Sequence, residues 1–494
     1  MAAVIRIHPA DNVAVAVEAI EAAGEVRAGG ATVTAVEAIP PGHKVAMAPV
    51  AAGDPVVKYG YPIGHATAAI APGAHVHTHN VATNLAGRTA LKYAPASPAD
   101  LPTPSATTFE GFLRGDGRVG IRNEIWIVPT VGCVNGVAEA LAAAARQRFA
   151  DAGIDGVYAF THPLGCSQVG EDHRRTQRIL AGLVHHPNAA GVLVLGLGCE
   201  ENHLASFAEV LGPADPARVA MVNSQDVDDE IAEGLRRLDP IVRRAAAMRR
   251  QSVPLSSLCI ALKCGGSDGF SGITANPLVG AVADRIVAAG GSALLTEVPE
   301  MFGAEAPLLG RCAGPEVFDA ALRMINDFRA WFVAHGVSVD KNPSPGNRAG
   351  GITTLEEKSL GCVTKGGRGP ITDVLTYGQR VRRPGVSLVD GPGDDMVAVT
   401  TLAAAGAHLV LFTTGRGTPL SGPAPTIKVA TNARLAAAKG RWIDFDAAPI
   451  LAGEPIDTLA DALLADVLAV AGGRRTANER SGIRQIAIFT DGVT

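Results

Sequence analysis

Two kinds of segment alternate along the chain from residue 109 onward. Short apolar runs, such as "EIWIVPTV", "GVYAF" and "GVLVLGL", each precede a longer stretch with apolar positions at helical spacing. Those longer stretches are "GVAEALAAAARQRFA", "EDHRRTQRILAGLV" and "NHLASFAEVL". Strands that alternate with helices in this way are typical of a parallel sheet covered by helices. We therefore predict an α/β fold with mainly parallel sheets.

Changes in this pattern predict the domain organisation. Residues 1–92 hold short alternating runs, such as "ATVTAV" and "DPVVKYG", broken by Gly and Pro, which predicts a small β-rich domain. Residues 93–108 are rich in Pro, Ser, Thr and Ala and are predicted to be a linker. We expect a central α/β domain over 109–250. A second α/β domain, which opens with "SLCIALKCGGSDG", is expected over 251–494.

Composition narrows the class of protein. The 494 residues are too many for one core, and 47% hydrophobic with 18% charged residues is typical of a soluble globular protein. A formal net charge of −5 without a long basic block argues against nucleic acid as a partner. No apolar run reaches the roughly 18 residues of a membrane helix, and no signal-peptide core is evident. We expect a cytoplasmic protein with no membrane partner, and a homo-oligomer is one option for its assembly.

Three of the apolar runs end in Gly-Cys, at Cys133, Cys166 and Cys199, which are equally spaced. Cys264 also directly follows an apolar run, in the second α/β region, although Lys263 and not a glycine precedes it. Ligands of open parallel sheets bind beyond the carboxyl ends of the strands, so four thiols there can converge on one cleft. Thiolates are soft ligands that suit iron or zinc. Packing of cysteine as a small apolar side chain explains the same positions equally well.

Histidines gather near the end of the N-terminal region, in "HVHTHN". If this segment is a strand, His75, His77 and His79 project from one face. Three imidazoles on one face favour a divalent metal site or a proton relay, with a solvated surface as the plain alternative. We predict His75 and His77 as metal ligands.

Several polar segments lack apolar periodicity and are candidate substrate sites. "KCGGSDGFSGITANP" holds Ser267, Asp268 and Asn276 in a turn whose backbone amides can bind a carboxylate. Arg416, in "FTTGRGTP", directly follows a predicted strand, where a guanidinium can clamp a carboxylate at two points. Arg122 and Asn123, in "RGDGRVGIRNE", are predicted to lie on a substrate-binding loop. A surface turn is the alternative for the two arginine segments.

Several long segments of the chain are highly specific, namely "DGRVGIRNEIWIVPTVGCVNG", "CGGSDGFSGITANPLVG", "LTEVPEMFGAE" and "NPSPGNRAGGITTLEEKSLG". They resemble the altronate and galactarate dehydratase family of sugar-acid hydro-lyases, and the similarity covers essentially the whole chain. The "HVHTHN" segment and the ending resemble the altronate branch. The resemblance implies a small N-terminal β-clip (SAF) domain, two α/β regions and an iron(II)-dependent dehydration.

That dehydration would convert D-altronate to 2-keto-3-deoxy-D-gluconate, a step of hexuronate catabolism. It removes the proton beside the carboxylate and expels the neighbouring hydroxyl, so it needs a base, an acid and a group that stabilises the enediolate. His162 and Glu200, each beside a strand-end cysteine, are predicted as the acid and base, and Lys358 is a third candidate.

The cofactor and the substrate leave alternatives open. Iron would be a single Fe2+ ion or an iron–sulfur cluster on the cysteines, and Mn2+ is a further option. Galactarate or sulfolactate are alternative substrates. A sugar-acid-binding protein that lacks catalysis is the alternative outside enzymes.

Overall fold

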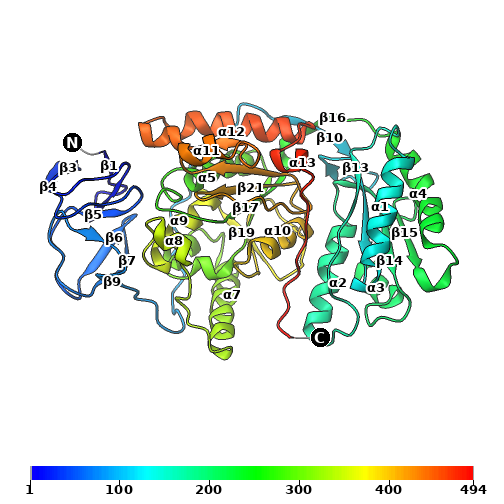
Figure 1. Ribbon diagram of the computed structural model, residues 1–494, viewed down its shortest axis with the longest axis horizontal. Helices are drawn as coiled ribbons and strands as arrows, with labels where there is room; N and C mark the ends of the chain where they lie inside the picture. The colour runs from blue at the N-terminus through cyan, green and yellow to red at the C-terminus, as the bar shows by residue number, and fades with distance from the viewer. Residues whose placement is uncertain (1–2, 493–494) are drawn as a thin grey trace.

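A computed structural model describes residues 3–492, which form three domains side by side (Figure 1). The small N-terminal domain lies at one end, the C-terminal α/β domain in the middle, and the central α/β domain at the other end. The order in space therefore differs from the order in the chain. Within residues 3–492, no helix is long and apolar enough to span a membrane.

The N-terminal domain is built from short antiparallel strands, as the alternating pattern predicts. One sheet has the order β1-β2-β5-β8, a second has the order β6-β7-β9, and β3 pairs with β4. The alternating apolar residues of these strands point inward and fill a small core that includes Val26 and Val45. The strands are β1 (Val4–Ile5), β2 (Val13–Ala16), β3 (Glu25–Ala28), β4 (Ala31–Thr34), β5 (Lys44–Ala46), β6 (Pro55–Lys58), β7 (Tyr61–Ala66), β8 (His75–Val76) and β9 (Val81–Ala82).

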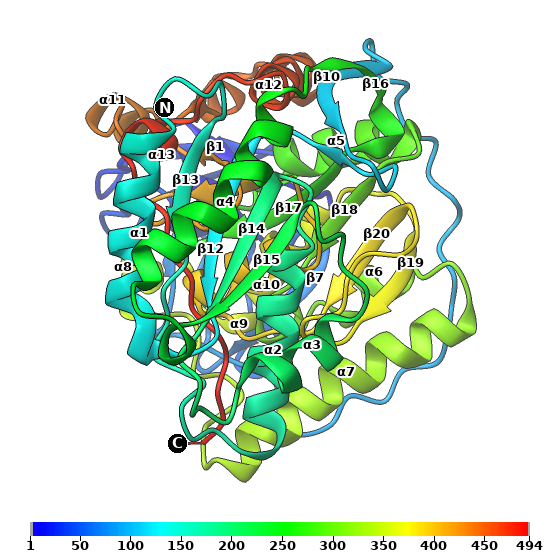
Figure 2. The ribbon, with the colours of Figure 1, turned by 90° about the vertical axis from the view of Figure 1, so that its right-hand side faces the viewer.

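Residues 83–107 contain no helix or strand and connect the N-terminal domain to the central domain. Figure 2 shows this segment, in blue, passing α7 (Pro315–Ala334) on the outside of the molecule and rising to β10 (Thr108–Leu113). It contacts the C-terminal domain through apolar side chains, such as Leu85 and Leu91, which pack against the C-terminal core. Polar contacts add to these, such as the hydrogen bond of 2.9 Å from the Tyr93 hydroxyl to the carbonyl of Cys312.

The central domain has a four-stranded parallel sheet of order β13-β12-β14-β15. Alternate residues of β14 point to opposite faces: Leu193 and Leu195 pack against α1 and α4, whereas Val192 and Val194 pack against α2 and α3. Burial on both faces explains the continuous apolar run. The elements are β11 (Val119–Gly120), β12 (Glu124–Pro129), α1 (Asn135–Arg148), β13 (Gly156–Ala159), α2 (Gly170–Val184), β14 (Ala189–Gly196), α3 (Leu204–Leu211), β15 (Val219–Asn223), α4 (Glu230–Ala246) and β16 (Gln251–Pro254).

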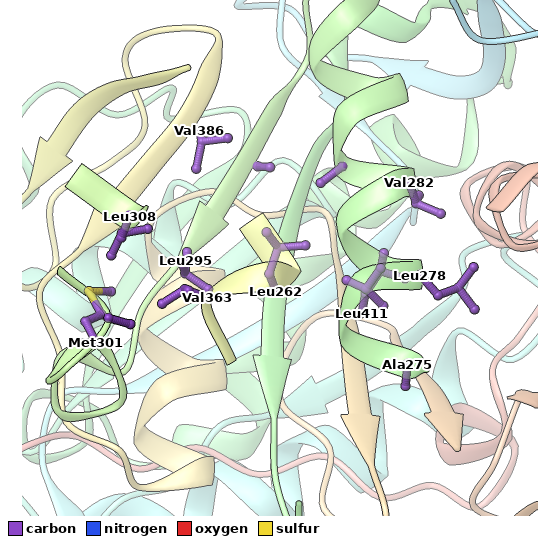
Figure 3. Close-up of a cluster of buried hydrophobic side chains, with 14 of the residues drawn as sticks. Leu262, Ala275, Leu278, Val282, Leu295, Met301, Leu308, Val363, Val386 and Leu411 are labelled. Atoms are coloured by element: carbon purple, nitrogen blue, oxygen red, sulfur yellow. The ribbon is translucent and has the colours of Figure 1, made fainter. Parts of the chain in front are cut away.

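The C-terminal domain has a seven-stranded parallel sheet of order β19-β20-β18-β17-β21-β22-β23. Figure 3 shows Leu262 and Leu411 of the sheet beside Leu278 and Val282 of α5. The elements are β17 (Cys259–Cys264), α5 (Ala275–Ala288), β18 (Ser292–Leu295), α6 (Glu305–Leu309), α7, α8 (Pro345–Ala349), α9 (Leu355–Val363), β19 (Ile371–Leu375), β20 (Gly385–Val389), α10 (Asp395–Ala404), β21 (Leu409–Thr414), β22 (Thr426–Ala430), α11 (Ala433–Ala438), β23 (Phe445–Asp446), α12 (Ile456–Ala471) and α13 (Ala477–Arg480).

The central and C-terminal domains share an apolar core between α2 and α10. The C-terminal tail, red in Figure 1, descends between them and contributes Ile486 and Ile488 to this core. Arg484 of the tail pairs with Glu124 of β12 at 2.7 Å, and both side chains are buried. The two α/β domains are therefore joined by packing and by a buried ion pair.

Candidate functional site

Three histidine side chains of the N-terminal domain form a cluster that faces the C-terminal domain. The ring centroid of His43 lies 5.1 Å from that of His75 and 4.8 Å from that of His77. His43 Nδ1 lies 3.0 Å from His75 Nε2. Across the interface, His77 Nδ1 is 3.0 Å from the hydroxyl of Thr353, and His43 Nε2 is 3.4 Å from the carbonyl of Ala349.

The histidine segment is not one strand, so that part of the sequence prediction is wrong. Strand β8 ends at Val76, and a turn follows in which the side chain of Asn80 accepts a hydrogen bond of 3.0 Å from the N–H of His77. The rings still meet because β8 pairs with β5, and His43 stands just before β5. Strand pairing therefore adds a third histidine that alternation along one segment does not reveal.

Burial lowers the pKa of all three histidines, to about 4 for His75 and about 3 for His77. The charge of the nearby Lys44 adds to the effect. These rings are therefore neutral at pH 7, which is the state that binds a metal.

A buried ion cluster attaches the N-terminal domain to α9, directly beneath the histidines. Lys44 Nζ and Lys58 Nζ each lie 2.8 Å from a carboxylate oxygen of Glu357. Glu357 also accepts a hydrogen bond of 2.8 Å from the backbone N–H of Thr353. Burial favours the neutral acid, but the two ammonium groups outweigh it and lower the pKa of Glu357 to about 2. The charged cluster thus holds the segment before α9 against the histidines.

A cavity of about 780 Å³ lies between the N-terminal and C-terminal domains. Val17 and Pro41 line it on one side, and Asp268 and Arg416 line it on the other. Arg416 is exposed, and its Nη1 lies 3.4 Å from the carbonyl of Gly346. The cationic side chains along the wall are Arg416, Arg434 and Lys439. With Asp268 as the one carboxylate among these described lining residues, the cavity suits an anionic ligand.

A second cavity, of only about 10 Å³, adjoins the first at Asp268. Four of the predicted substrate-binding or catalytic residues line it together, namely Ser267, Asp268, Asn276 and Lys358. A space of this size holds roughly one water molecule. A sugar acid is therefore too large for this cavity, and in the larger one it would meet Asp268, which lines both.

Asp268 is the polar centre of the wall between the two cavities. Its carboxylate accepts hydrogen bonds from the side chains of Ser271, Thr431 and Asn432 at 3.1, 2.9 and 3.0 Å. Burial raises the pKa of Asp268 in spite of these donors. A Cβ atom on Gly415 would lie 2.4 Å from a carboxylate oxygen of Asp268, which explains the glycine that precedes Arg416.

Buried thiols and carboxylates lie next to the small cavity. Cys264 Sγ is 3.3 Å from Cys362 Sγ and 3.2 Å from a carboxylate oxygen of Glu300. The ligand atoms of these three residues lie close enough together to hold one metal ion. Lys358 pairs with Glu300 at 2.7 Å. Burial alone would lower the pKa of Lys358, but Glu300 raises it, so Lys358 is an ammonium ion at neutral pH.

Lysines already balance the charge of this buried cluster. Lys365 Nζ lies 2.7 Å from Cys264 Sγ, and Lys263 and Lys365 both pair with Glu297. A hydrogen bond with Cys362, together with the charge of Lys365, lowers the pKa of Cys264 to about 6. A metal ion bound to Cys264 would therefore have to displace an ammonium group.

The other three strand-end cysteines lie on the central domain, separate from Cys264. Cys133, Cys166 and Cys199 are exposed at the carboxyl edge of the sheet, after β12, β13 and β14. The N-terminal and central domains lie on opposite sides of the C-terminal domain (Figures 1 and 2), so this edge is remote from the histidines. The expectation that all four cysteines converge on one cleft is wrong.

His162 and Glu200 lie at this cysteine edge and are engaged by the protein itself. His162 Nε2 donates to the carbonyl of Pro129 at 2.9 Å, and its Nδ1 accepts from the N–H of Leu164 at 3.2 Å. Glu200 accepts from the hydroxyl of Thr130 at 2.8 Å and from two backbone N–H groups of its own loop. Both side chains shape the cysteine loops.

Arg122 and Asn123 are buried between elements and line neither of the two cavities described above. Arg122 pairs with Glu479 at 2.8 Å and donates to the carbonyl of Val470 at 2.7 Å. Asn123 donates to the carbonyl of Ala245 at 2.9 Å. Neither side chain is therefore available to a ligand in these two cavities.

Sequence reasoning missed His43, Glu300 and Cys362. For Cys362 a usable signal exists, because it stands four residues after Lys358 on α9, and that spacing places both on one helical face. Glu300 follows Glu297 within the apolar segment "LTEVPEMFG", where two buried carboxylates require cationic partners. His43 carries no comparable local signal.

Three family models together match nearly the whole chain. They are the altronate/galactarate dehydratase SAF domain over 2–84, the D-galactarate dehydratase/altronate hydrolase second domain over 111–246, and the D-galactarate/altronate dehydratase C-terminal region over 255–494. The first match falls on the small β domain that carries the histidine cluster. The other two fall on the two parallel α/β domains.

Three known proteins are similar to this chain over nearly its whole length. Altronate dehydratase of Escherichia coli is 48% identical over 99% of both chains, and altronate dehydratase of Bacillus subtilis is 47% identical over 100% of both. Galactarate dehydratase (L-threo-forming) of Escherichia coli is 32% identical over 98% of this chain and 96% of its own. The chain belongs to the altronate and galactarate dehydratase family of hydro-lyases.

Proposed function

We propose that the protein dehydrates D-altronate to 2-keto-3-deoxy-D-gluconate. The observation that carries this proposal is the 48% identity, over full length, with a protein named altronate dehydratase, against 32% with galactarate dehydratase. The cavity between the N-terminal and C-terminal domains supports it, because cationic side chains along the wall suit a sugar carboxylate.

Within this proposal, three residues that line the two adjoining cavities have separate roles. The guanidinium of Arg416 binds the substrate carboxylate. Asp268, the carboxylate common to both cavities, takes the proton from the carbon beside that carboxylate. The ammonium group of Lys358, kept protonated by Glu300, stabilises the negative charge of the resulting enediolate.

The proposed iron site is the cluster of His43, His75 and His77. The ring centroids lie 4.8 to 5.6 Å apart, burial keeps the rings neutral at pH 7, and imidazole nitrogens are suitable ligands for Fe2+. When bound, iron would supply a Lewis acid to the oxygen atoms of the substrate. The position supports this role, since Ala349 contacts His43 while the next residue, Gly350, lines the large cavity.

Anaerobic assays with D-altronate, galactarate and sulfolactate test the proposal. Formation of the keto acid should be fastest with D-altronate, should stop after chelation and should return with Fe2+. Mn2+ is tested in parallel. Asp268→Asn should lower kcat far more than it raises KM, because the carboxylate acts in proton transfer. Absence of keto acid from D-altronate in iron-loaded protein would reject the assignment, and binding without turnover would indicate a sugar-acid-binding protein.

A further inference from the structure

Three of the seven cysteines are exposed, and these three lie together. Cys133, Cys166 and Cys199 are exposed, whereas the other cysteines are buried, at positions 259, 264, 312 and 362. An exposed thiol does not contribute to a packed core, so packing does not account for these positions. Exposed free thiols are readily oxidised, so a cluster of three calls for a functional explanation.

The loops that carry these cysteines are bonded to one another. The N–H of Gly132 donates to the carbonyl of Leu164 at 2.9 Å, which joins the first loop to the second. The N–H of Glu201 donates to the carbonyl of Cys166 at 3.0 Å, and the side chain of Asn202 donates to the carbonyl of Thr130 at 2.9 Å. Each pair of loops is thus linked, and the edge is a rigid platform.

The three loops lie so close together that little room is left for a side chain at the residue before each cysteine, which explains the glycines. Gly165 has a φ of +98°, and a Cβ atom there would lie 2.1 Å from the carbonyl oxygen of Thr130. Gly198 has a φ of +124°, which side chains rarely adopt. A Cβ on Gly132 would lie 3.0 Å from the carbonyl oxygen of His162. The Gly-Cys pairs let the three loops meet.

The side chains of Cys133 and Cys166 are hydrogen-bonding neighbours, and Cys199 lies close to them. A cationic centre bound between the three sulfur atoms would stabilise their thiolate forms. Gln225 Nε2 lies 3.4 Å from Cys199 Sγ, a contact of the kind that tunes metal-bound sulfur.

We propose that Cys133, Cys166 and Cys199 bind an iron–sulfur cluster at the outer edge of the central sheet. Three thiolates would ligate three iron atoms, and the remaining position of a four-iron cluster would be open to water or an external ligand. A structural zinc site needs four protein ligands, and the nearest carboxylate, Glu200, is held by Thr130 and backbone N–H groups. The cluster is distinct from the proposed iron site, which lies across the C-terminal domain.

The test is anaerobic reconstitution of the full chain with Fe2+ and sulfide, followed by iron and acid-labile sulfide analysis and visible spectroscopy. The wild type should bind about four iron and four sulfide in the cluster. Cys133→Ser, Cys166→Ser and Cys199→Ser should each lose sulfide, iron and visible absorption together. The buried Cys259→Ser and Cys312→Ser are matched controls that should keep all three. Circular dichroism spectra and Tm values show whether each variant is folded.

His77→Ala separates this proposal from the proposed function. It should lower altronate turnover and leave the sulfide content unchanged. The cluster proposal is overturned if sulfide persists in a folded variant that lacks all three cysteines. It is equally overturned if the anaerobic wild type carries zinc without sulfide on these thiols, or a disulfide between Cys133 and Cys166.

Discussion

Arg416 is the side chain whose role is most open to a direct test. It is exposed at the cavity, so Arg416→Ala should leave Tm nearly unchanged. Loss of a charged hydrogen bond worth about 1.5–3 kcal/mol should lower kcat/KM for D-altronate by roughly 10- to 150-fold, mainly through KM. Steady-state kinetics measure this. Arg441→Ala, an exposed arginine of the same domain that does not line the cavity, is the control and should behave as wild type.

The burial of each cysteine also predicts the order in which the thiols are alkylated. In metal-free, reduced protein, iodoacetamide should label Cys133, Cys166 and Cys199 first, because only accessible thiols meet the reagent. Cys259 should stay unlabelled, since burial raises its pKa to about 12. Mass spectrometry of labelled peptides over time gives the order. Early labelling of Cys259 would contradict the exposure that the structure assigns.

At the scale of elements, the attachment of α9 to the N-terminal domain depends on the buried carboxylate of Glu357. Glu357→Gln leaves the ammonium groups of Lys44 and Lys58 without a counter-charge, and should cost about 3–5 kcal/mol of stability at pH 7. Burial opposes ionisation, yet the two lysines lower the pKa of Glu357 to about 2, from an ordinary value of 4.5. The stabilisation is therefore complete above about pH 4.5 and is lost as the pH falls toward 2.

Denaturant unfolding at several pH values checks this prediction. The difference between wild type and Glu357→Gln should be largest at neutral pH and should shrink in acid. Glu316→Gln, on the exposed first turn of α7, is the matched control and should show little difference at any pH. A constant difference from pH 7 to pH 3 would show that the carboxylate is not held in its charged form.

Elements that bury both faces could be predicted from the sequence, whereas contacts between elements could not. The runs ending at Cys133, Cys199 and Cys264 are strands, because a parallel strand covered on two sides has no polar face. His77 lies in a turn that Asn80 closes through both its side chain and its backbone N–H, and alternation along the segment does not reveal such a turn. Cys264 lies apart from Cys133, Cys166 and Cys199 because the two parallel sheets belong to different domains. Local periodicity in the sequence does not show how those two sheets are placed in space.

On the scale of the whole molecule, Arg484 joins the two α/β domains. Its guanidinium is buried against Glu124 and Glu479, so Arg484→Met leaves the buried carboxylate of Glu124 without a cationic partner, whereas Glu479 keeps Arg122. We expect a loss of about 3–5 kcal/mol and faster proteolysis between the domains. Arg480→Met, an exposed arginine at the end of α13, is the control. Equal Tm values for the two variants would mean that packing alone holds the domains together.

The extended segment 83–107 has a kinetic consequence. It contains no helix or strand. It tethers the N-terminal domain, which holds the three histidines, beside a cavity lined mainly by residues between 268 and 452. Its main effect is to keep the local concentration of the N-terminal domain high, in the millimolar range typical of short tethers. A protein nicked in this segment would behave as two associating subunits held by the Lys44–Glu357 contact. Its activity would then fall on dilution, while that of the intact chain would not.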